Sequence, residues 1–376
     1  MKVTFENATI ADSVGKAARV APTKGEAFDK ASGILLTLDP DDSTVTLRTT
    51  NLHVFYLEVV DTVELDMGSA LDGTWRLNAQ MLAQVMGKLP IGSGKTVTFE
   101  DKDGEVLVKS GRTTARFRKM DHTYFPQWEP FDPNKLDMVP DFGARLKQVE
   151  WAADDDDGSP IAGIRLDGER AIATDRFRLA IVPCEAEPIY KPITIPAGIL
   201  KPIIGNLRDV AIGIDEGVFL LMPDTSTQIR TRIYDRDYPN VVKAMDERTW
   251  PNKITARKQA LIDIMERAMI FAQRDRIPKM TCIVGNNEFA VMCSDADLGL
   301  LGDVVELDTD QADHPRYRIL FTPRNLIEAL QAAPSEVVDI FYDPENANFP
   351  FKIDGGSGYT ALVMPRRETE GGDGGS

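Results

Sequence analysis

Residues 143–182, GARLKQVEWAADDDDGSPIAGIRLDGERAIATDRFRLAIV, carry the pattern that decides the fold. Apolar residues recur three or four positions apart across 143–153, which predicts an amphipathic helix with one buried face. Two strands are expected next, at 161–168 and 169–182, because the Asp-Gly pair between them is typical of a hairpin turn. The stretch therefore predicts one helix followed by a pair of antiparallel strands.

The same order of elements occurs three times, at a spacing of roughly 115 to 125 residues. Each copy begins with an amphipathic helix and a strand pair, continues with a second helix, and closes with another hairpin. The first helices are expected at 13–21, 143–153 and 260–273, and the second helices at 78–89, 196–207 and 323–333. The fold class is therefore expected to be α+β, with three repeated domains that each pack two helices on antiparallel sheets. The alternative is an α+β protein with hairpins and helices but no repeat.

Two aromatic–proline pairs, Phe125-Pro126 and Tyr238-Pro239, mark the expected linkers. They divide the chain into domains at 1–127, 128–250 and 251–367. The last residues, 368–376, are rich in glycine and acidic side chains, so we expect this tail to be disordered.

Length and composition exclude several classes of protein. The chain has 376 residues, of which 43% are hydrophobic and 27% charged, as is usual for a soluble globular protein. No apolar run approaches the roughly 20 residues that a membrane-spanning helix requires. The start, MKVTFENATI, lacks the basic and then apolar pattern of a secretory signal, so a cytoplasmic protein is expected. Three cysteines without a paired spacing exclude a disulfide framework.

No constellation of residues indicates catalysis, a metal or a cofactor. The three histidines are scattered, and neither a Cys/His cluster nor a nucleophile–base set is present. IGSGKT at 91–96 resembles part of a phosphate-binding loop, but Leu89 stands where the first glycine is required, so a turn before a strand is expected. The acidic run at 154–157 is typical of a solvated turn, and Asp175 is expected to be a structural turn carboxylate. These motifs are the only support for an NTPase or a metal-dependent enzyme, and we expect neither enzymatic activity nor a cofactor.

Several segments, by their order and spacing, resemble the bacterial sliding clamp family, the β subunits of replicative DNA polymerase III. The clearest are FPQW (125–128), ATDRFRLA (173–180), YPNVVKAM (238–245) and VMPRR (363–367), and the resemblance extends from residue 1 to about residue 367. It implies a homodimer, closed head to tail into a ring of DNA-clamp domains around double-stranded DNA of any sequence. It also implies a non-catalytic processivity factor that binds the replicative polymerase, the clamp loader and other proteins through short peptides.

The charge distribution fits a basic hole inside an acidic shell. The net charge is −16, yet the six expected helices and their flanks have a balance of about +7, which leaves about −23 for the rest. The residues expected to face DNA are Lys16, Arg19, Lys24, Lys88, Arg145, Lys147, Lys201, Arg208, Arg257 and Lys258. The alternative for these side chains is an ordinary solvated helix face.

The resemblance also implies a peptide-binding cleft built from three segments of the chain. Its residues would be Thr174, Arg176, Phe177, Arg178, Leu179, Pro239, Lys243, Leu362, Val363, Met364, Pro365, Arg366 and Arg367, and hairpin pairing adds Ile161 opposite the ATD strand. Arg176 and Phe177 stand where the family usually has Gly-His, and Arg366 stands where an apolar residue is usual. These departures fit a phage- or plasmid-encoded clamp. They also keep open a clamp-fold interaction protein that binds such peptides without encircling DNA.

Two edges of the repeated sheets are expected to join the copies, because an unpaired strand edge is a template for pairing. The resemblance implies an interface made by Arg112, Ala115 and Phe117 of one copy with Ile270 and Phe271 of the other. Ile270 and Phe271 as core residues of the third domain are the alternative.

Overall fold

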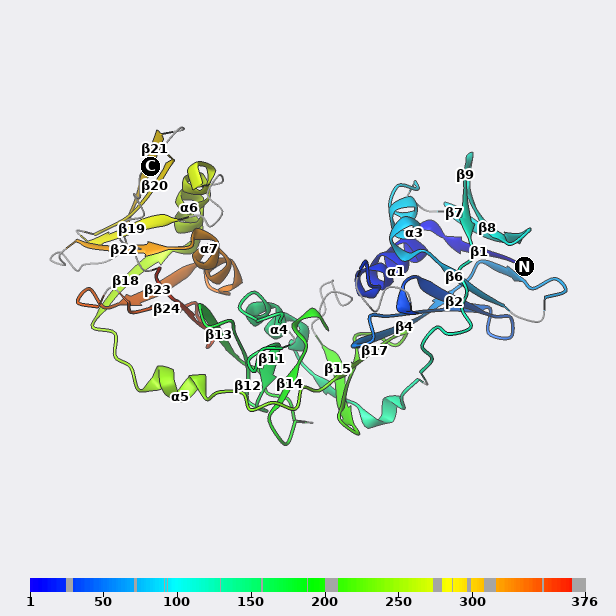
Figure 1. Cartoon of the computed structure of the whole chain (residues 1–376), viewed down its shortest axis with the longest axis horizontal. Helices are drawn as coiled ribbons and strands as arrows, with labels where there is room; N and C mark the ends of the chain where they lie inside the picture. The colour runs from blue at the N-terminus through cyan, green and yellow to red at the C-terminus, as the bar shows by residue number, and fades with distance from the viewer. Residues whose placement is uncertain are drawn as a thin grey trace, which may run out of the picture. The chain divides into compact units, whose positions relative to one another are not determined.

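The computed structural model (Figure 1) describes residues 1–366 apart from 25–29, 71–72, 91, 93, 129, 157, 188, 200–208, 273–278, 286, 296–298, 308–315 and 347. Its contacts group the chain into two compact units. The first comprises Met1–Ala144, Glu187–Tyr190 and Gly198–Tyr234, and the second comprises Arg145–Ala186, Lys191–Ala197 and Asp235–Ser376. The boundary passes through the expected second domain, and the division at 127 and 250 stays a prediction.

The first unit contains two antiparallel sheets. One has the strand order β5 (Glu64–Asp66), β1 (Lys2–Glu6), β7 (Thr96–Lys102), β8 (Glu105–Ser110) and β9 (Thr113–Arg118). The other has the order β10 (Asp137–Val139), β15 (Val210–Asp215), β16 (Val218–Met222), β17 (Thr227–Arg232), β4 (Val54–Asp61), β3 (Thr44–Thr50), β2 (Ile34–Asp39) and β6 (Thr74–Leu77). A short 3-10 helix, η1 (Pro133–Lys135), precedes β10.

Helices α1 (Asn7–Val20) and α3 (Ala79–Met86) pack against each other in the first unit, as Figure 1 shows. Ile10, Val14 and Ala17 of α1 and Leu82 and Met86 of α3 are buried, at the three- and four-residue spacing expected of one apolar face. The Asn78 side chain caps α3 by accepting the Met81 N–H at 2.9 Å. The buried helix faces close this core.

The second unit also contains two antiparallel sheets. One has the order β14 (Ile193–Ile195), β11 (Ile164–Leu166), β12 (Arg170–Thr174), β13 (Arg178–Pro183), β25 (Thr360–Val363), β24 (Phe351–Asp354), β23 (Val337–Tyr342) and β18 (Asn252–Arg257). The other has the order β21 (Gly299–Glu306), β20 (Glu288–Asp295), β19 (Met280–Gly285) and β22 (Tyr317–Phe321). The first sheet joins strands from the middle of the sequence to its last strand through the β13–β25 pair.

Helices α6 (Lys258–Ala272) and α7 (Pro323–Ala332) pack against each other in the second unit, and α5 (Val241–Asp246) lies in the segment before β18. Helix α4 (Phe142–Glu150) spans the boundary between the two sets of residues. Phe321, Tyr342 and Phe351 form an aromatic cluster in the core, with the Phe321 and Phe351 ring centroids 4.5 Å apart. None of the helices in the described ranges is long and apolar enough to cross a membrane.

The observed helices agree with five of the six expected ones. Helix α1 begins at Asn7 rather than near residue 13, and the helix expected at 196–207 lies mostly outside the described residues. The single strand expected at 169–182 is wrong. It is a hairpin of β12 and β13, because Asp175 and Arg176 form a turn in which Arg176 has a φ of 78°.

Candidate functional site

The β12–β13 turn is held by the side chain of Asp175. Its Oδ1 atom accepts the backbone N–H groups of Phe177 at 2.9 Å and Arg178 at 2.8 Å. The Thr174 hydroxyl donates to the Arg178 carbonyl at 2.6 Å and accepts the Arg176 N–H at 3.2 Å. With its backbone groups paired in this way, the turn presents Arg176 and Phe177 to solvent. Asp175 is therefore a structural turn carboxylate, as expected from the sequence.

Arg178 links this turn to helix α7. Its Nε donates to Asp175 Oδ2 at 2.9 Å, and its Nη1 donates to Glu328 Oε2. Its guanidinium also lies over the Trp151 ring, 5.5 Å from the centroid. Only 18% of the Arg178 side chain is exposed. Because both its charge and its planar face are occupied within the chain, Arg178 positions the turn rather than offering a free cation.

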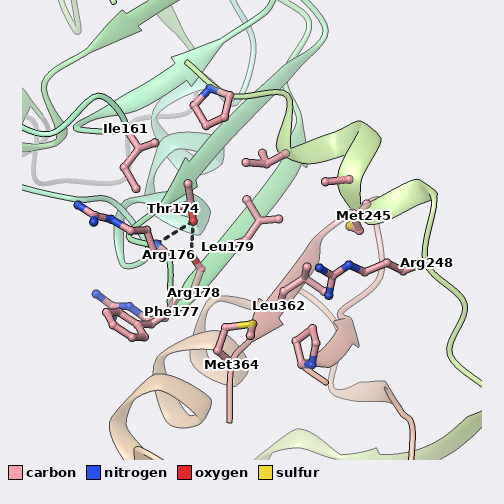
Figure 2. Close-up of a pocket in the computed structure, with 14 residues that line it drawn as sticks. Ile161, Thr174, Arg176, Phe177, Arg178, Leu179, Met245, Arg248, Leu362 and Met364 are labelled. Atoms are coloured by element: carbon pink, nitrogen blue, oxygen red, sulfur yellow. Dashed lines mark hydrogen bonds between the residues drawn. The ribbon is translucent and has the colours of Figure 1, made fainter. Parts of the chain in front are cut away.

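A groove of about 250 Å³ opens beside this turn. In Figure 2, Leu362 and Met364, at and just beyond the end of the C-terminal strand, lie between the turn residues Arg176 and Phe177 on one side and Met245 and Arg248 on the other. The full lining is Ile161, Thr174, Arg176, Phe177, Arg178, Leu179, Pro239, Val241, Ala244, Met245, Arg248, Pro350, Leu362 and Met364. The lining is mostly apolar, and two of its three cations, Arg176 and Arg248, are exposed, a composition suited to anchoring one or two apolar side chains of a peptide.

Helix α5 forms one wall of the groove. Val241, Val242 and Met245 pack against a cluster of Ile172, Leu179 and Ile181 on the sheet, together with Tyr238 and Leu362. The Asn240 side chain caps the helix by accepting the Lys243 N–H at 3.0 Å. This packing fixes the segment that begins at Tyr238 on the sheet face.

The C-terminal segment forms another part of the lining. Strand β25 pairs with β13, so that Leu362 lies opposite Leu179. Beyond the strand, the Met364 N–H donates to the Phe177 carbonyl at 2.8 Å, and the Arg366 N–H donates to the Leu320 carbonyl at 2.7 Å. The first bond holds the chain against the β12–β13 turn, and the second holds it against strand β22.

Two titratable groups beside the groove have shifted pKa values. Burial raises the pKa of Tyr238, although Arg165 and a backbone contact to Thr174 oppose the shift. Burial acts to raise the pKa of Asp154, but hydrogen bonds from Ser159 and the Asp156 N–H, together with the charge of Arg176, lower it overall. Tyr238 is therefore neutral and Asp154 ionised at neutral pH.

The groove brings together nine of the fourteen cleft residues expected from the sequence. Lys243 is not part of its lining, and its side chain is exposed and lies 3.8 Å from Glu247. Val363 is the last residue of β25 and is fully buried. Pro365 and Arg366 follow it and are not part of the lining. Arg367 lies outside the described residues. The groove is also lined by five residues that were not expected from the sequence: Val241, Ala244, Met245, Arg248 and Pro350.

Comparison with known proteins identifies the fold. No protein-family model matches the chain. A curated relative, the beta sliding clamp of Synechocystis sp., is 24% identical over 335 residues, which cover 78% of this chain and 82% of the relative. The solved DNA polymerase III beta subunit of Thermotoga maritima is 19% identical and covers 97% of this chain and 99% of its own, with a TM-score of 0.78. The Bacillus subtilis sliding clamp is 17% identical, with coverage of 98% and 99% and a TM-score of 0.75.

This chain has the sliding-clamp fold. The α+β class and the resemblance found in the sequence are both confirmed. The structural likeness covers 97% of this chain and 99% of the Thermotoga maritima subunit. The identity of 17% to 24% shows that the sequence is divergent.

The basic residues expected to face DNA differ in their exposure and in whether they have a partner within the chain. Arg19, Lys24, Lys88 and Arg257 are exposed and have no ion-pair partner within the described ranges. Arg145 and Lys147 lie on α4, and Lys201 and Arg208 are outside the described residues. Lys258 donates to the Ala333 carbonyl at 2.7 Å.

Lys16 is the clearest case of a charge used inside the fold. Its side chain is 22% exposed, and its Nζ lies 2.8 Å from Asp12 Oδ2 and 3.7 Å from Glu58 Oε1. Burial opposes its charge, but the hydrogen bond to Asp12 and the charges of Glu58 and Asp12 outweigh this, so its pKa is raised. Glu58 is itself buried and accepts hydrogen bonds from Ser13 and Tyr56.

The residues expected at a dimer interface lie at one edge strand, β9, and on the helix that packs on another edge strand, β21. Arg112, Ala115 and Phe117 are on or next to edge strand β9, where Phe117 is 6% exposed and packs within its own sheet. Ile270 and Phe271 are on α6, which packs on edge strand β21. Ile270 is 58% exposed and Phe271 is half-buried, so neither is a fully buried core residue.

Proposed function

We propose that this protein is a DNA sliding clamp, a homodimeric ring that encircles double-stranded DNA and tethers the replicative polymerase. The observation that carries the proposal is the likeness to solved DNA polymerase III beta subunits over 97% to 98% of the chain. A likeness of this length accounts for all the sheets rather than for one domain. The three domains of the ring would be 1–127, 128–250 and 251–367, and the clamp would work in the cytoplasm on replicating DNA.

Two unpaired strand edges support ring closure. Among the described strands, β9 pairs only with β8 and β21 pairs only with β20. An exposed edge offers free N–H and C=O groups to another strand. If β9 of one copy joins β21 of the next, each copy uses both of these edges, and two copies form a closed, symmetric assembly.

The side chains along these edges are complementary. Arg112, Arg116 and Arg118 give the β9 edge a positive charge, and Glu306 gives the β21 edge a negative one, whereas Asp303 is already paired with Arg267 at 2.6 Å. Exposed apolar residues on the β21 side, Leu300, Val304 and Ile270, would be buried when the strands meet. Two β9 edges would repel each other, so the charges favour head-to-tail pairing over pairing of like edges.

Binding to DNA would rest on exposed cations rather than on base recognition. Arg19, Lys24 and Lys88 have charges that no carboxylate of the described residues neutralises. Contacts from such side chains to phosphates carry no sequence information and weaken with salt. That is the behaviour required of a protein that must slide, and no side chain is assigned a catalytic role.

The groove between α5 and the C-terminal strand would bind the polymerase, the clamp loader and other partners. Its apolar lining would take apolar side chains of a short peptide, and its rim would supply polar contacts. Phe177, which is 64% exposed, gives this groove an aromatic residue at its edge that a partner could cover.

Retention on DNA circles tests this function. The protein is loaded on a nicked plasmid by the loader of its own source, and the plasmid is then cut once with a restriction enzyme. A topologically closed ring remains on the circle and leaves the linear DNA through its ends. Equal retention on both forms would contradict encirclement. Peptide binding with no retention on either form would favour the interaction protein that does not encircle DNA.

A further inference from the structure

A second cavity, of about 270 Å³, lies on the same sheet face as the groove. Its lining includes Arg165, Asp167, Arg170, Ile172 and Tyr238, and it shares Pro239 and Val241 with the groove. The two cavities therefore lie on either side of the segment that leads into α5. Nothing in the proposed function so far uses this second cavity.

The strand register sets the distance between the two cavities. On β12, Ile172 lines the second cavity and Thr174 lines the groove, so these side chains are two residues apart on one face. A separation of two residues along a strand is about 6.6 Å. A single extended peptide is long enough to contact both sites.

The electrostatics of the cavity are dominated by one unpaired cation. Asp167 is fully used, because its Oδ1 accepts the backbone N–H groups of Glu169 and Arg170, and its Oδ2 accepts the Arg170 Nε at 3.0 Å. Arg165 has no carboxylate partner among the described residues. Its Nη1 donates to the Thr194 hydroxyl over a long 3.4 Å, and its guanidinium lies 5.9 Å from the Tyr238 ring centroid.

The position of Arg165 makes this cation a fixed one. It lies on β11 between Thr194 of β14 and Ile172 of β12, both of which are buried. A half-buried guanidinium on an interior strand that lines a cavity is suited to bind a carboxylate.

We propose that Arg165 binds an acidic side chain of the partner peptide whose apolar residues occupy the groove. This inference rests on the proposed peptide-binding function and adds to it a preference for peptides with Asp or Glu next to the apolar residues. A carboxylate bound at Arg165 would supply the ionic partner that the fold leaves out.

The binding of two peptides to the wild-type protein and three variants tests this preference. Fluorescein-labelled peptides carry Leu-Phe in a Gly-Ser context, one with neutral flanks and one with Glu residues in the flanks. We expect the acidic peptide to bind the wild-type protein about tenfold more tightly than the neutral one, and Arg165→Gln to remove this gain. Arg165→Lys keeps the charge but not the planar fork and should retain part of the gain. Arg48→Gln, a half-buried arginine on β3, is the matched control and should leave the gain unchanged.

The outcomes separate this inference from the proposed function. If the neutral peptide binds but the acidic flanks add nothing, or add as much in Arg165→Gln, the inference is wrong while peptide binding stands. If only the acidic peptide binds, and only when Arg165 is present, the carboxylate binds without support from the apolar groove, which contradicts both the inference as stated and the role of the groove. Binding of neither peptide overturns both.

Displacement of the acidic peptide by low concentrations of inorganic phosphate would assign the cavity to a free anion and overturn the peptide assignment. Thermal unfolding of each variant shows that it is folded.

Discussion

At the scale of single residues, Asp175 organises the turn that presents one edge of the groove. Its carboxylate accepts two backbone N–H groups and the Arg178 Nε, so its removal leaves three donors without their partner. We expect Asp175→Ala to lower the free energy of unfolding by about 1–3 kcal/mol, measured by urea denaturation. Asp175→Asn keeps an oxygen acceptor for the backbone and should lose less. Equal losses in the two variants would mean that the turn depends on the charge rather than on the backbone bonds.

Substitutions of Phe177 and Leu179, which lie in the same hairpin, should affect peptide binding and stability differently. Phe177 is 64% exposed, so Phe177→Ala should change the free energy of unfolding by less than about 0.5 kcal/mol. Since a bound peptide would cover much of this ring, the affinity for the Leu-Phe peptide should fall about tenfold. Leu179 is 6% exposed, and Leu179→Ala should cost about 2–4 kcal/mol of stability as well as affinity. Unchanged affinity in Phe177→Ala would remove Phe177 from the binding site.

The role of Lys16 illustrates what composition does not reveal. From the sequence it is one of several basic residues on a helix, but Glu58 is on a strand more than forty positions away, and only the fold brings the two together. Because its pKa is raised, charged Lys16 stabilises the fold below the usual lysine pKa of 10.5, and this stabilisation is lost as the pH rises through the higher value. Lys16 therefore stays charged at neutral pH, but Asp12 and Glu58 reduce what it can offer to DNA.

At the scale of elements, the sequence predicted helices better than it predicted the walls of the site. The buried faces of α1, α3, α6 and α7 recur at helical spacing, which periodicity detects. Helix α5 is only six residues long and has no buried residue of its own, so its pattern is too short to be read. Val241, Ala244 and Met245 were missed for that reason. The β12–β13 turn was missed because polar residues within an apolar run carry no glycine or proline signal.

The proposed dimer interface at β21 and the neighbouring helix α6 can be tested by substitution. If Ile270 is buried between two copies, Ile270→Ser should weaken the dimer at least tenfold without unfolding either copy, because the side chain is 58% exposed in the single chain. Val63→Ser, at the same 58% exposure in a turn of the other unit, is the matched control and should leave the dimer intact. Sedimentation equilibrium measures the dissociation constant of each. An unchanged constant for Ile270→Ser would place the interface elsewhere.

At the scale of the whole molecule, encirclement separates two properties that are coupled in ordinary DNA-binding proteins. The exposed cations should govern how readily the ring is loaded, since they attract phosphates over a distance. The lifetime on a closed circle should depend on the ring instead, because sliding does not break it. If the protein is a clamp, we expect that removing exposed positive charges slows loading and leaves the lifetime on the closed circle unchanged.

The variant Arg19→Gln, Lys24→Gln and Lys88→Gln tests this separation, and it leaves out Lys16 so that the fold is not disturbed. We expect loading on nicked plasmid to fall at least tenfold and to become less dependent on salt, because each lost phosphate contact reduces the salt slope by about 0.9. The lifetime of the loaded fraction on the circle should equal that of the wild type. The control Lys95→Gln, Lys102→Gln and Lys279→Gln removes the same charge from exposed positions on strands and turns and should load normally. If both triple variants load equally poorly, net charge rather than a basic surface governs loading. If the first variant leaves closed circles faster, the cations hold the DNA directly and the ring is not what retains it.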